Sequence, residues 1–210
     1  DVCSSDLVSY LTPGDCVIEL NQDADANYNA AATDTQTISV GKGLQTITWA
    51  ESAPTDKVVD GATYTPTATG GASGNAVTFS IASGSASICS ITNGEVSFHA
   101  VGDCVVLANQ LGDTIWEAAP EESMTIAVGK GSQTINFSST APSNAVVAGT
   151  NYTVTATGGG TGHPINFWIS LSSNSVCTIA GGVVSFVGVG TCLIQASQNG
   201  DANYEAAPIA

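Results

Sequence analysis

The sequence contains no arginine and only three lysines, against eighteen aspartate and glutamate residues in a chain of 210. The formal net charge of −15 argues against nucleic acids and anionic membrane surfaces as partners, because like charges repel. The absence of arginine also removes the bidentate side chain that best binds anions. No stretch approaches the ~20 apolar residues of a membrane span, so we expect no membrane insertion.

What the chain does contain favours an all-β fold. Threonine, valine, isoleucine, serine and glycine dominate, and hydrophobic residues make up 43% of the chain, which is enough to build a core. The two histidines, His99 and His163, occupy unrelated positions, and no serine lies in a nucleophile-elbow sequence. We therefore expect no catalytic residue, no cofactor and a protein that is not an enzyme.

One pattern recurs at a fixed interval of 88 residues. The aromatic residues Tyr28, Trp116 and Tyr204 lie 88 apart, within "NQDADANYNAA", "NQLGDTIWEAAP" and "QNGDANYEAAP". The same interval separates the cysteines of two series, which are Cys16, Cys104 and Cys192, and Cys89 and Cys177. A period that never slips indicates a tandem array of one 88-residue unit.

This register divides the chain into three segments. We expect residues 8–42 (the first segment) to be the C-terminal remnant of a truncated unit and residues 43–130 (the middle segment) to be a complete unit. Residues 131–210 (the last segment) are expected to be a unit without its last strand. Residues 1–7, "DVCSSDL", match no other copy and resemble the translation of a sequencing-library adapter, so we exclude them.

The middle segment carries seven strand signals separated by turn sequences rich in Gly, Asn and Asp. They span residues 45–49, 63–69, 76–82, 87–92, 95–101, 104–110 and 123–128. Pro66 falls inside the second of these strands. Because proline cannot donate a hydrogen bond to a sheet, we expect an edge or a bulge at that position.

The recurring motifs, "QTI", "ATGG", "GTC" and above all "QNGDANYEAAP", resemble those of bacterial immunoglobulin-like (Ig-like) repeats in large secreted and cell-surface proteins. The resemblance covers the chain from about Val8 to Ala210. It implies tandem Ig-like β-sandwich domains of about seven strands each, in a rod-like array. It does not fix a function, because such repeats serve as spacers, adhesin stalks or modules beside enzymes.

The cysteines indicate the clearest chemistry. Cys89 and Cys104 are 15 residues apart, as are Cys177 and Cys192, and each alternates with apolar residues expected to point inward. We expect disulfides Cys89–Cys104 and Cys177–Cys192, with Cys16 unpaired because its partner position holds no cysteine. The spacing lacks the close pairs of a zinc site, and we expect no metal there. Disulfides imply an extracellular location, which the resemblance specifies as the bacterial cell surface.

The acidic stretch before each recurring aromatic has two interpretations. "DADAN" offers alternating oxygen donors of the kind that calcium prefers, in Asp23, Asp25 and Asn27, but the other copies keep only part of this set. We therefore expect a structural corner and no metal site.

In that corner Gly200 is expected to take a positive φ, and Asp201 to accept hydrogen bonds from nearby backbone amides. Trp116 and Tyr204 are expected to pack onto the end of the core.

Two functions of different class fit these features. The favoured one is a non-catalytic stalk or spacer of a bacterial cell-surface or secreted adhesin-like protein, whose partners are the neighbouring repeats. The alternative is a carbohydrate- or ligand-binding accessory module of a larger extracellular enzyme, with a cell-surface glycan or protein as partner. Its best feature is Trp168, which follows the inward Phe167, should point outward, and could stack on a sugar ring.

The incomplete segments lead to one further expectation. The last segment lacks the counterpart of residues 123–128, which would leave a strand edge and part of a core exposed. Residues 35–41 of the first segment are homologous to the missing strand. We expect this strand of one molecule to complete the last segment of another by strand addition.

Overall fold

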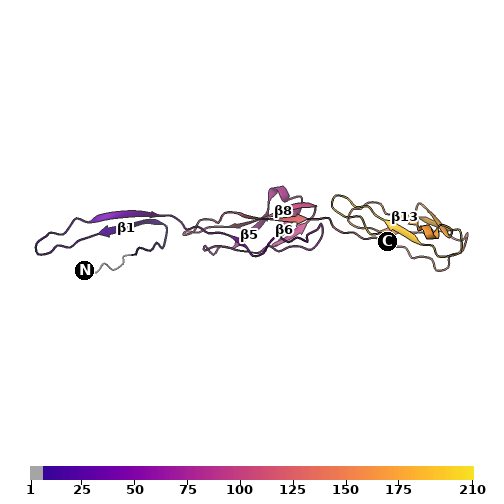
Figure 1. Ribbon diagram of the computed structural model, residues 1–210, viewed down its shortest axis with the longest axis horizontal. Coiled ribbons are helices and arrows are strands. Elements are labelled where there is room, and N and C mark those ends of the chain that lie inside the picture. Colours follow the sequence, from indigo (N-terminus) through magenta and orange to yellow (C-terminus); the bar gives the residue numbers. More distant parts are fainter. Residues whose placement is uncertain (1–6) are drawn as a thin grey trace. The chain divides into compact units, whose positions relative to one another are not determined.

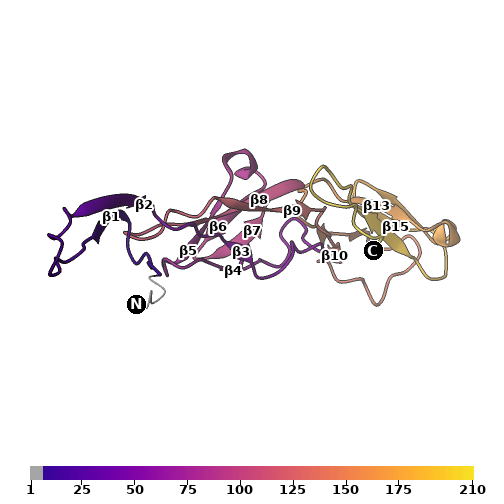
Figure 2. The same cartoon turned by 60° about the vertical axis from the view of Figure 1, so that its left-hand side comes forward.

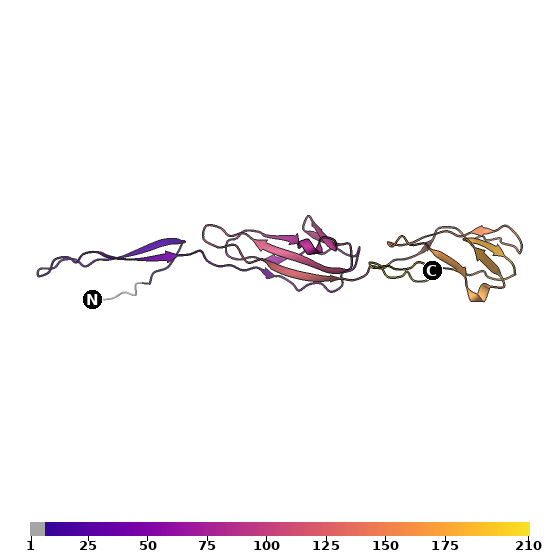
Figure 3. The ribbon, with the colours of Figure 1, turned by 90° about the horizontal axis from the view of Figure 1, so that it is seen from above.

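The computed structural model describes residues 7–210 (Figure 1). These residues are almost entirely β, with two short 3-10 turns, η1(Ser83–Ser85) and η2(Leu171–Ser173), the second visible as the orange coil in Figure 3. No helix within them is long and apolar enough to cross a membrane. The chain divides into two compact units. Unit 1 holds the chain up to Ser52 with Pro66–Ser80 and Val106–Met124, and unit 2 holds Ala53–Thr65, Ile81–Val105 and Thr125–Ala210.

Unit 1 begins with a hairpin of two seven-residue strands, β1(Gly14–Leu20) and β2(Asp34–Val40). They pair antiparallel, from Gly14 opposite Val40 to Leu20 opposite Asp34, and lie side by side in Figures 1 and 2. Both strands are largely exposed, and β1 leaves Val17 54% and Leu20 71% exposed. The hairpin therefore exposes apolar side chains that a packed sheet would bury, and an isolated two-stranded hairpin is only marginally stable in water.

The rest of unit 1 forms a small core. β3(Thr48–Trp49) pairs with β4(Ala68–Thr69), and β5(Val77–Ile81) follows. Ile47, Ala108 and Ala119 are buried at its centre, with Trp49 and Phe79 packed against them. The two aromatic rings stack with their centroids 5.7 Å apart, which extends the contact.

Unit 2 contains one hairpin and three small sheets. The hairpin pairs β6(Cys89–Thr92) with β7(Glu95–Phe98). Two of the sheets have two strands each, β10(Asn136–Phe137) with β12(Ala156–Thr157) and β13(Asn166–Ile169) with β16(Ile194–Ser197). In the third sheet β15(Val183–Phe186) lies between β11(Tyr152–Thr153) and β14(Cys177–Ala180). Val154 and Val184 are buried in one cluster, and Ile135 and Ala196 in a second. Phe167 packs against both clusters and so connects them.

Two further strands, β8(Gly102–Gln110) and β9(Glu122–Val128), have residues in both units and complete a sheet in the order β5-β8-β9. Alternate residues of β9 are buried, with Met124, Ile126 and Val128 only 6%, 0% and 4% exposed. This period of two is that of a strand with one face in a core. The described chain is therefore all-β, and its open sheets fit a β-sandwich.

Each of the seven strands expected for the middle segment has a counterpart, although the first five are shorter than expected, the first two most of all. Pro66 explains part of the difference. Before it, Tyr64 bridges Val96, and after it Ala68 pairs with Trp49, so the chain changes its pairing partner at the residue that has no N–H to donate.

Both expected disulfides are present. Cys89–Cys104 and Cys177–Cys192 each join Cα atoms 5.8 Å apart across 15 residues of sequence. Cys89 and Cys104 are buried, at 1% and 0% exposure, beside the apolar side chains with which they alternate. Cys16 is free and half-buried on β1, as expected, whereas Cys3 lies outside the described residues. Residues 1–6 of the suspected adapter also lie outside them.

Removing one bridge tests its contribution to stability. We expect the double substitution Cys89→Ala and Cys104→Ala to reduce the free energy of unfolding by about 3 kcal/mol, because the bridge restricts the unfolded chain. Chemical denaturation monitored by Trp fluorescence measures this change. Cys16→Ala is the matched control and should leave stability unchanged, and an equal loss there would contradict the assignment.

Candidate functional site

The recurring acidic–aromatic motif forms the same loop in each copy. We call residues 113–117 and 201–205 the aspartate loops. In the first of them, Asp113 Oδ1 accepts hydrogen bonds from the amides of Ile115 at 2.8 Å and Trp116 at 2.7 Å. In the second, Asp201 Oδ1 accepts from Asn203 and Tyr204, both at 2.8 Å. The prediction that this aspartate binds nearby backbone amides is confirmed.

Each aspartate loop also binds the Gly-Lys-Gly stretch at the start of its own segment, residues 41–43 or 129–131, which we call the linker. Gly43 N donates to Ile115 O at 2.9 Å, and Glu117 N donates back to Gly43 O at 2.8 Å. Lys42 Nζ donates to Asp113 O at 2.6 Å. This set of bonds, which we call the linker contact, pairs a linker glycine in parallel with the loop.

The same linker contact recurs 88 residues later. Gly131 N donates to Asn203 O, and Glu205 N donates to Gly131 O, both at 2.9 Å. Lys130 Nζ donates to Asp201 O at 2.7 Å. Two stretches of different local sequence, "DTIWE" and "DANYE", therefore bind their linkers through the same atoms.

One buried glutamine supports each aspartate loop and a second binds the neighbouring glycine-rich turn, and sequence reasoning missed both. Gln45, only 6% exposed, donates to Leu111 O at 3.2 Å and Glu117 O at 2.7 Å. Gln110, 3% exposed, accepts from Gly71 N at 2.7 Å. Gln133 and Gln198 make equivalent contacts in the last segment. Strict recurrence of glutamine at these positions was the available signal, since buried amides must find partners.

The glycine of the corner acts differently from the expectation. Gly200 does not have a positive φ, so that prediction is wrong. A Cβ at this position would instead lie 2.4 Å from Tyr204 O, and one on Gly112 would lie 2.3 Å from Trp116 O. Glycine is required here because the loop backbone folds back onto it.

The recurring aromatic side chains pack on linker glycines, which differs from the expected packing onto the core. A Cβ on Gly43 would lie 2.5 Å from the Trp116 ring, and one on Gly131 would lie 3.0 Å from the Tyr204 ring. Both aromatic residues are half-buried, and neither belongs to the core clusters described above. Tyr28, the first copy, is 77% exposed.

Unit 2 adds two hydrogen bonds that the first aspartate loop cannot make. The Tyr204 hydroxyl donates to the Asp60 carboxylate in a short hydrogen bond. Asn203 Oδ1 accepts from Val101 N at 3.1 Å. Trp116 has no hydroxyl, and Ile115 has no side-chain acceptor. The side chains of residues 203 and 204 therefore connect the last segment to two loops of the middle segment within unit 2.

These hydrogen bonds shift three pKa values. The amides of Trp116 and Ile115 hold the pKa of Asp113 below its usual 3.8, because they favour the charged carboxylate. The amides of Asn203 and Tyr204 lower the pKa of Asp201 in the same way. The hydrogen bond to Asp60 is the main cause of a raised pKa for Tyr204, because it favours the neutral hydroxyl.

In all three copies of the acidic motif, an aspartate accepts hydrogen bonds from backbone amides. Asp25 Oδ1 accepts from the amides of Asn27 at 2.7 Å and Tyr28 at 2.8 Å, as its two counterparts do. Within residues 7–210, no group of three or more His, Cys, Asp or Glu side chains is gathered where it could hold a metal ion.

A serine–histidine contact was also missed. Ser90 Oγ lies 2.8 Å from His99 Nε2, but both residues are exposed on or beside the β6–β7 hairpin. His163 Nδ1 lies 3.3 Å from Asn199 O. Neither histidine lines the cavity described next.

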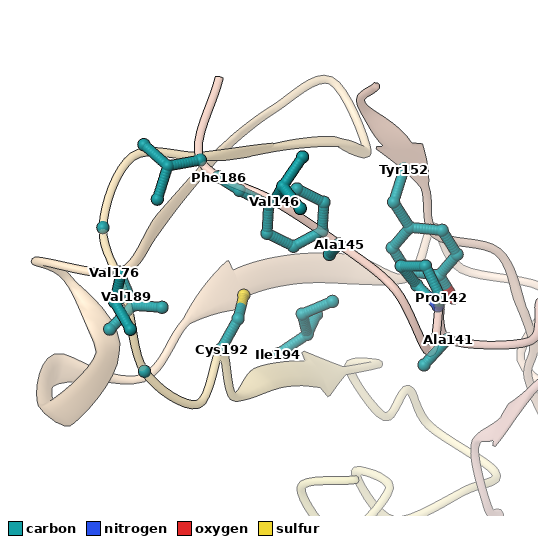
Figure 4. Close-up of a pocket in the computed structure, with 13 residues that line it drawn as sticks. Ala141, Pro142, Ala145, Val146, Tyr152, Val176, Phe186, Val189, Cys192 and Ile194 are labelled. Carbon is teal, nitrogen blue, oxygen red and sulfur yellow. The ribbon is translucent and has the colours of Figure 1, made fainter. Parts of the chain in front are cut away.

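A cavity of about 480 Å³ opens in the last segment, within unit 2 (Figure 4). Cys192 and Ile194 project into it from one side, and Val146 and Phe186 face them from the other. The lining is largely apolar, and Val146 is 65% exposed. Trp168, the candidate ligand contact, lies elsewhere on β13, half-buried, with its indole N–H donating to Gln195 Oε1 at 3.1 Å.

No family model matches this chain, and no curated protein matches it. Among solved structures, the crystal structure of Drosophila N-cadherin EC1-4 is similar at 11% sequence identity and a TM-score of 0.28. The match covers 91% of this chain and 56% of the cadherin chain, so this chain spans little more than half of that one. A TM-score this low carries no information about function.

The class of the protein therefore rests on its own sheets and disulfides. It is an all-β protein whose open sheets fit a β-sandwich. Its two disulfides fit an extracellular or secreted protein, because such bonds persist in oxidising compartments.

The lowered pKa of Asp113 predicts a pH dependence. A carboxylate whose pKa is depressed by folding stabilises the protein above its unfolded pKa, and this contribution is lost as pH falls through the folded value. We expect Asp113→Ala to lower the melting temperature at pH 7 and to have progressively less effect below about pH 3.8. Asp103→Ala, at another exposed aspartate, is the control and should change little. An Asp113→Ala effect that is independent of pH would contradict the assignment.

Proposed function

We propose that this chain is a non-catalytic spacer, made of tandem Ig-like repeats in the stalk of a bacterial cell-surface or secreted adhesin-like protein. The observation that carries the proposal is the recurrence of the linker contact at Gly43 and Gly131. A spacer must transmit force and orientation from one repeat to the next. A linker hydrogen-bonded to the following repeat has fewer free backbone torsions than an exposed one, and so resists hinge motion.

The atoms that recur in both copies of the linker contact are backbone N–H and C=O groups. The side chains that contribute, Asp113 and Lys42 or Asp201 and Lys130, bind backbone atoms as well. Such a contact is suited to connecting repeats whose other surface residues differ. Asp113 and Asp201 are thereby engaged as structural acceptors, which supports a structural role for the most acidic recurring motif.

A second candidate function is carbohydrate binding at Trp168. Phe167 packs into the core clusters, and Trp168 is the next residue of β13, so its indole lies on the opposite face of the strand. Gln195, which lies opposite on β16, supplies an amide beside the ring. An aromatic face beside a hydrogen-bonding amide is suited to a sugar ring, which has an apolar face and a polar rim.

Lengthening the linker tests the spacer function. We expect insertion of Gly-Ser-Gly-Ser between Lys130 and Gly131 to uncouple the tumbling of residues 43–130 from that of residues 131–210, because it separates Lys130 from the rest of the linker contact. ¹⁵N relaxation would then show two rotational correlation times in the variant and one in the natural chain. The same insertion at the exposed loop glycine Gly74 is the control. Two correlation times in the natural chain would contradict the spacer function.

A glycan array on the natural chain tests the alternative. If Trp168 binds sugar, Trp168→Ala should abolish glycan retention and change the melting temperature little. Trp116→Ala should leave retention intact but lower the melting temperature, because it exposes the linker contact at Gly43. Absence of retention by the natural chain would exclude the carbohydrate-binding function for the arrayed sugars and leave the spacer proposal standing.

A further inference from the structure

Each of the three lysines in this chain directly precedes a residue whose backbone pairs with a distant part of the sequence. These isolated pairings are all parallel, and they join Gly43 after Lys42 to Trp116, Val58 after Lys57 to Gly129, and Gly131 after Lys130 to Tyr204. The peptide bond that follows each lysine therefore belongs to a paired stretch of backbone.

The bonds after lysine are the ones that a trypsin-like protease would cut. Such an enzyme holds a basic side chain in a pocket with an aspartate at its base and takes the carbonyl of that residue into its oxyanion hole. Because the chain contains no arginine, it offers these proteases only the bonds 42–43, 57–58 and 130–131. The first and last of them lie in the linkers, and exposed connecting segments are the preferred sites of proteolytic nicking.

The bond in the first linker is paired and covered. Gly43 N, which is the nitrogen of the bond after Lys42, donates to Ile115 O at 2.9 Å. Gly43 O accepts from Glu117 N at 2.8 Å. The ring of Trp116 lies so close that a Cβ on Gly43 would be 2.5 Å from it. The backbone of this bond is therefore bonded to one aspartate loop, and an aromatic ring from the same loop packs against it.

The bond in the second linker is protected in the same way. Gly131 N, the nitrogen of the bond after Lys130, donates to Asn203 O at 2.9 Å. Gly131 is buried, and a Cβ on it would lie 2.6 Å from Val59 O and 3.0 Å from the ring of Tyr204. A protease must bind this stretch as a free, extended backbone, which the paired linker does not provide.

The linker lysines are held by the same loops that cover the bonds after them. The Lys42 ammonium donates to Asp113 O at 2.6 Å, and the Lys130 ammonium donates to Asp201 O at 2.7 Å. Both lysines are exposed, so a protease reaches their side chains more easily than the bonds that follow. The state of the aspartate loop therefore decides whether a linker can be cut.

The third lysine is protected by other means. Lys57 O, the carbonyl that an oxyanion hole would have to receive, accepts from Gly129 N at 2.8 Å. The Lys57 side chain is only 12% exposed, with its Nζ 3.6 Å from Asp56 Oδ1. This bond does not involve an aspartate loop, so it serves as an internal control for the two that do.

We propose that the aspartate loops protect the Lys–Gly bonds of the linkers from proteases of trypsin-like specificity. Asp113 and Asp201 hold the loops closed, and Trp116 and Tyr204 cover the bonds. The folded chain is cut at a linker only when its loop opens, at a rate that follows the population of the open loop. This protection is separate from the spacer function, because a linker can be shielded whether or not it transmits orientation.

Digestion of the full chain with trypsin tests this inference, with intact-mass spectrometry identifying each bond that is cut. We expect the natural chain to stay intact for as long as the same protease needs to cut the reduced, urea-unfolded chain after all three lysines. Glu51→Lys is the control for access. It places a lysine in the exposed loop after β3, so the folded variant should be cut rapidly after position 51.

Two aspartate variants serve as controls for each other. Asp113→Ala should raise the rate of cleavage after Lys42 about tenfold, the effect expected from losing a capping carboxylate, and leave Lys130 unchanged. Asp201→Ala should do the reverse. A general loss of stability would instead accelerate cleavage at every lysine, Lys57 included.

Variants of Tyr204 separate the covering ring from its hydrogen bond to Asp60. Tyr204→Phe keeps the ring, so cleavage after Lys130 should stay slow. Tyr204→Ala removes the ring and should make this bond as sensitive as it is in Asp201→Ala.

Three outcomes would overturn the proposal. The first is a natural chain that is cut at either linker as fast as Glu51→Lys is cut at position 51. The second is equal acceleration at all three lysines in both aspartate variants, which would mean that the loops stabilise the fold without protecting a particular bond. The third is unchanged cleavage in Asp113→Ala and Asp201→Ala.

Discussion

Burial of the inward side chains of β9 is the constraint on which the completed sheet depends. Met124, Ile126 and Val128 on β9, and Val59 in the segment that bonds to its end, are all less than a tenth exposed. Fully burying one such aliphatic side chain contributes about 1.5–3 kcal/mol. In the last segment Phe186 and Cys192 are half-buried and line a cavity, and β16 spans four residues against the nine of β8.

The aspartate loops depend on a different kind of interaction. One carboxylate oxygen accepts two amide hydrogens, which fixes the loop, and the fixed loop then offers its own amide and carbonyl to the linker glycine. The buried glutamines complete this arrangement by binding carbonyls on both sides of the loop. Polar groups that would be costly to bury alone therefore satisfy one another, and the apolar core is left to the strands.

Much of the strand pattern followed from sequence because alternation and turn residues are local signals. β9 is predicted within one residue, since its inward and outward side chains alternate without interruption. β3 and β4 are shorter than expected, because sequence alternation does not reveal where a strand changes partner. Pro66 predicted an interruption of the strand. The change of partner itself is located only by the pairing of Tyr64 with Val96 and of Ala68 with Trp49.

The candidate site was less predictable. Gly200 and Tyr204 were correctly singled out, but their roles depend on what approaches them: the Tyr204 carbonyl over Gly200, and Gly131 under the Tyr204 ring. Such contacts join residues whose proximity no local pattern encodes. That the Asp201 carboxylate accepts hydrogen bonds from backbone amides was predictable, because the donors lie only two and three residues away.

The sequence by itself determined the all-β class, the cysteine pairs and the 88-residue register, because composition, alternation and period are properties of the chain read in order. The register also revealed that β2 and β9 are strands of corresponding sequence. Only the tertiary structure decided that the recurring aromatics pack on linker glycines and that the buried Gln45 and Gln133 hold the aspartate loops. These depend on distances between atoms far apart in the chain, which are set when the sheets pack and the loops close over them.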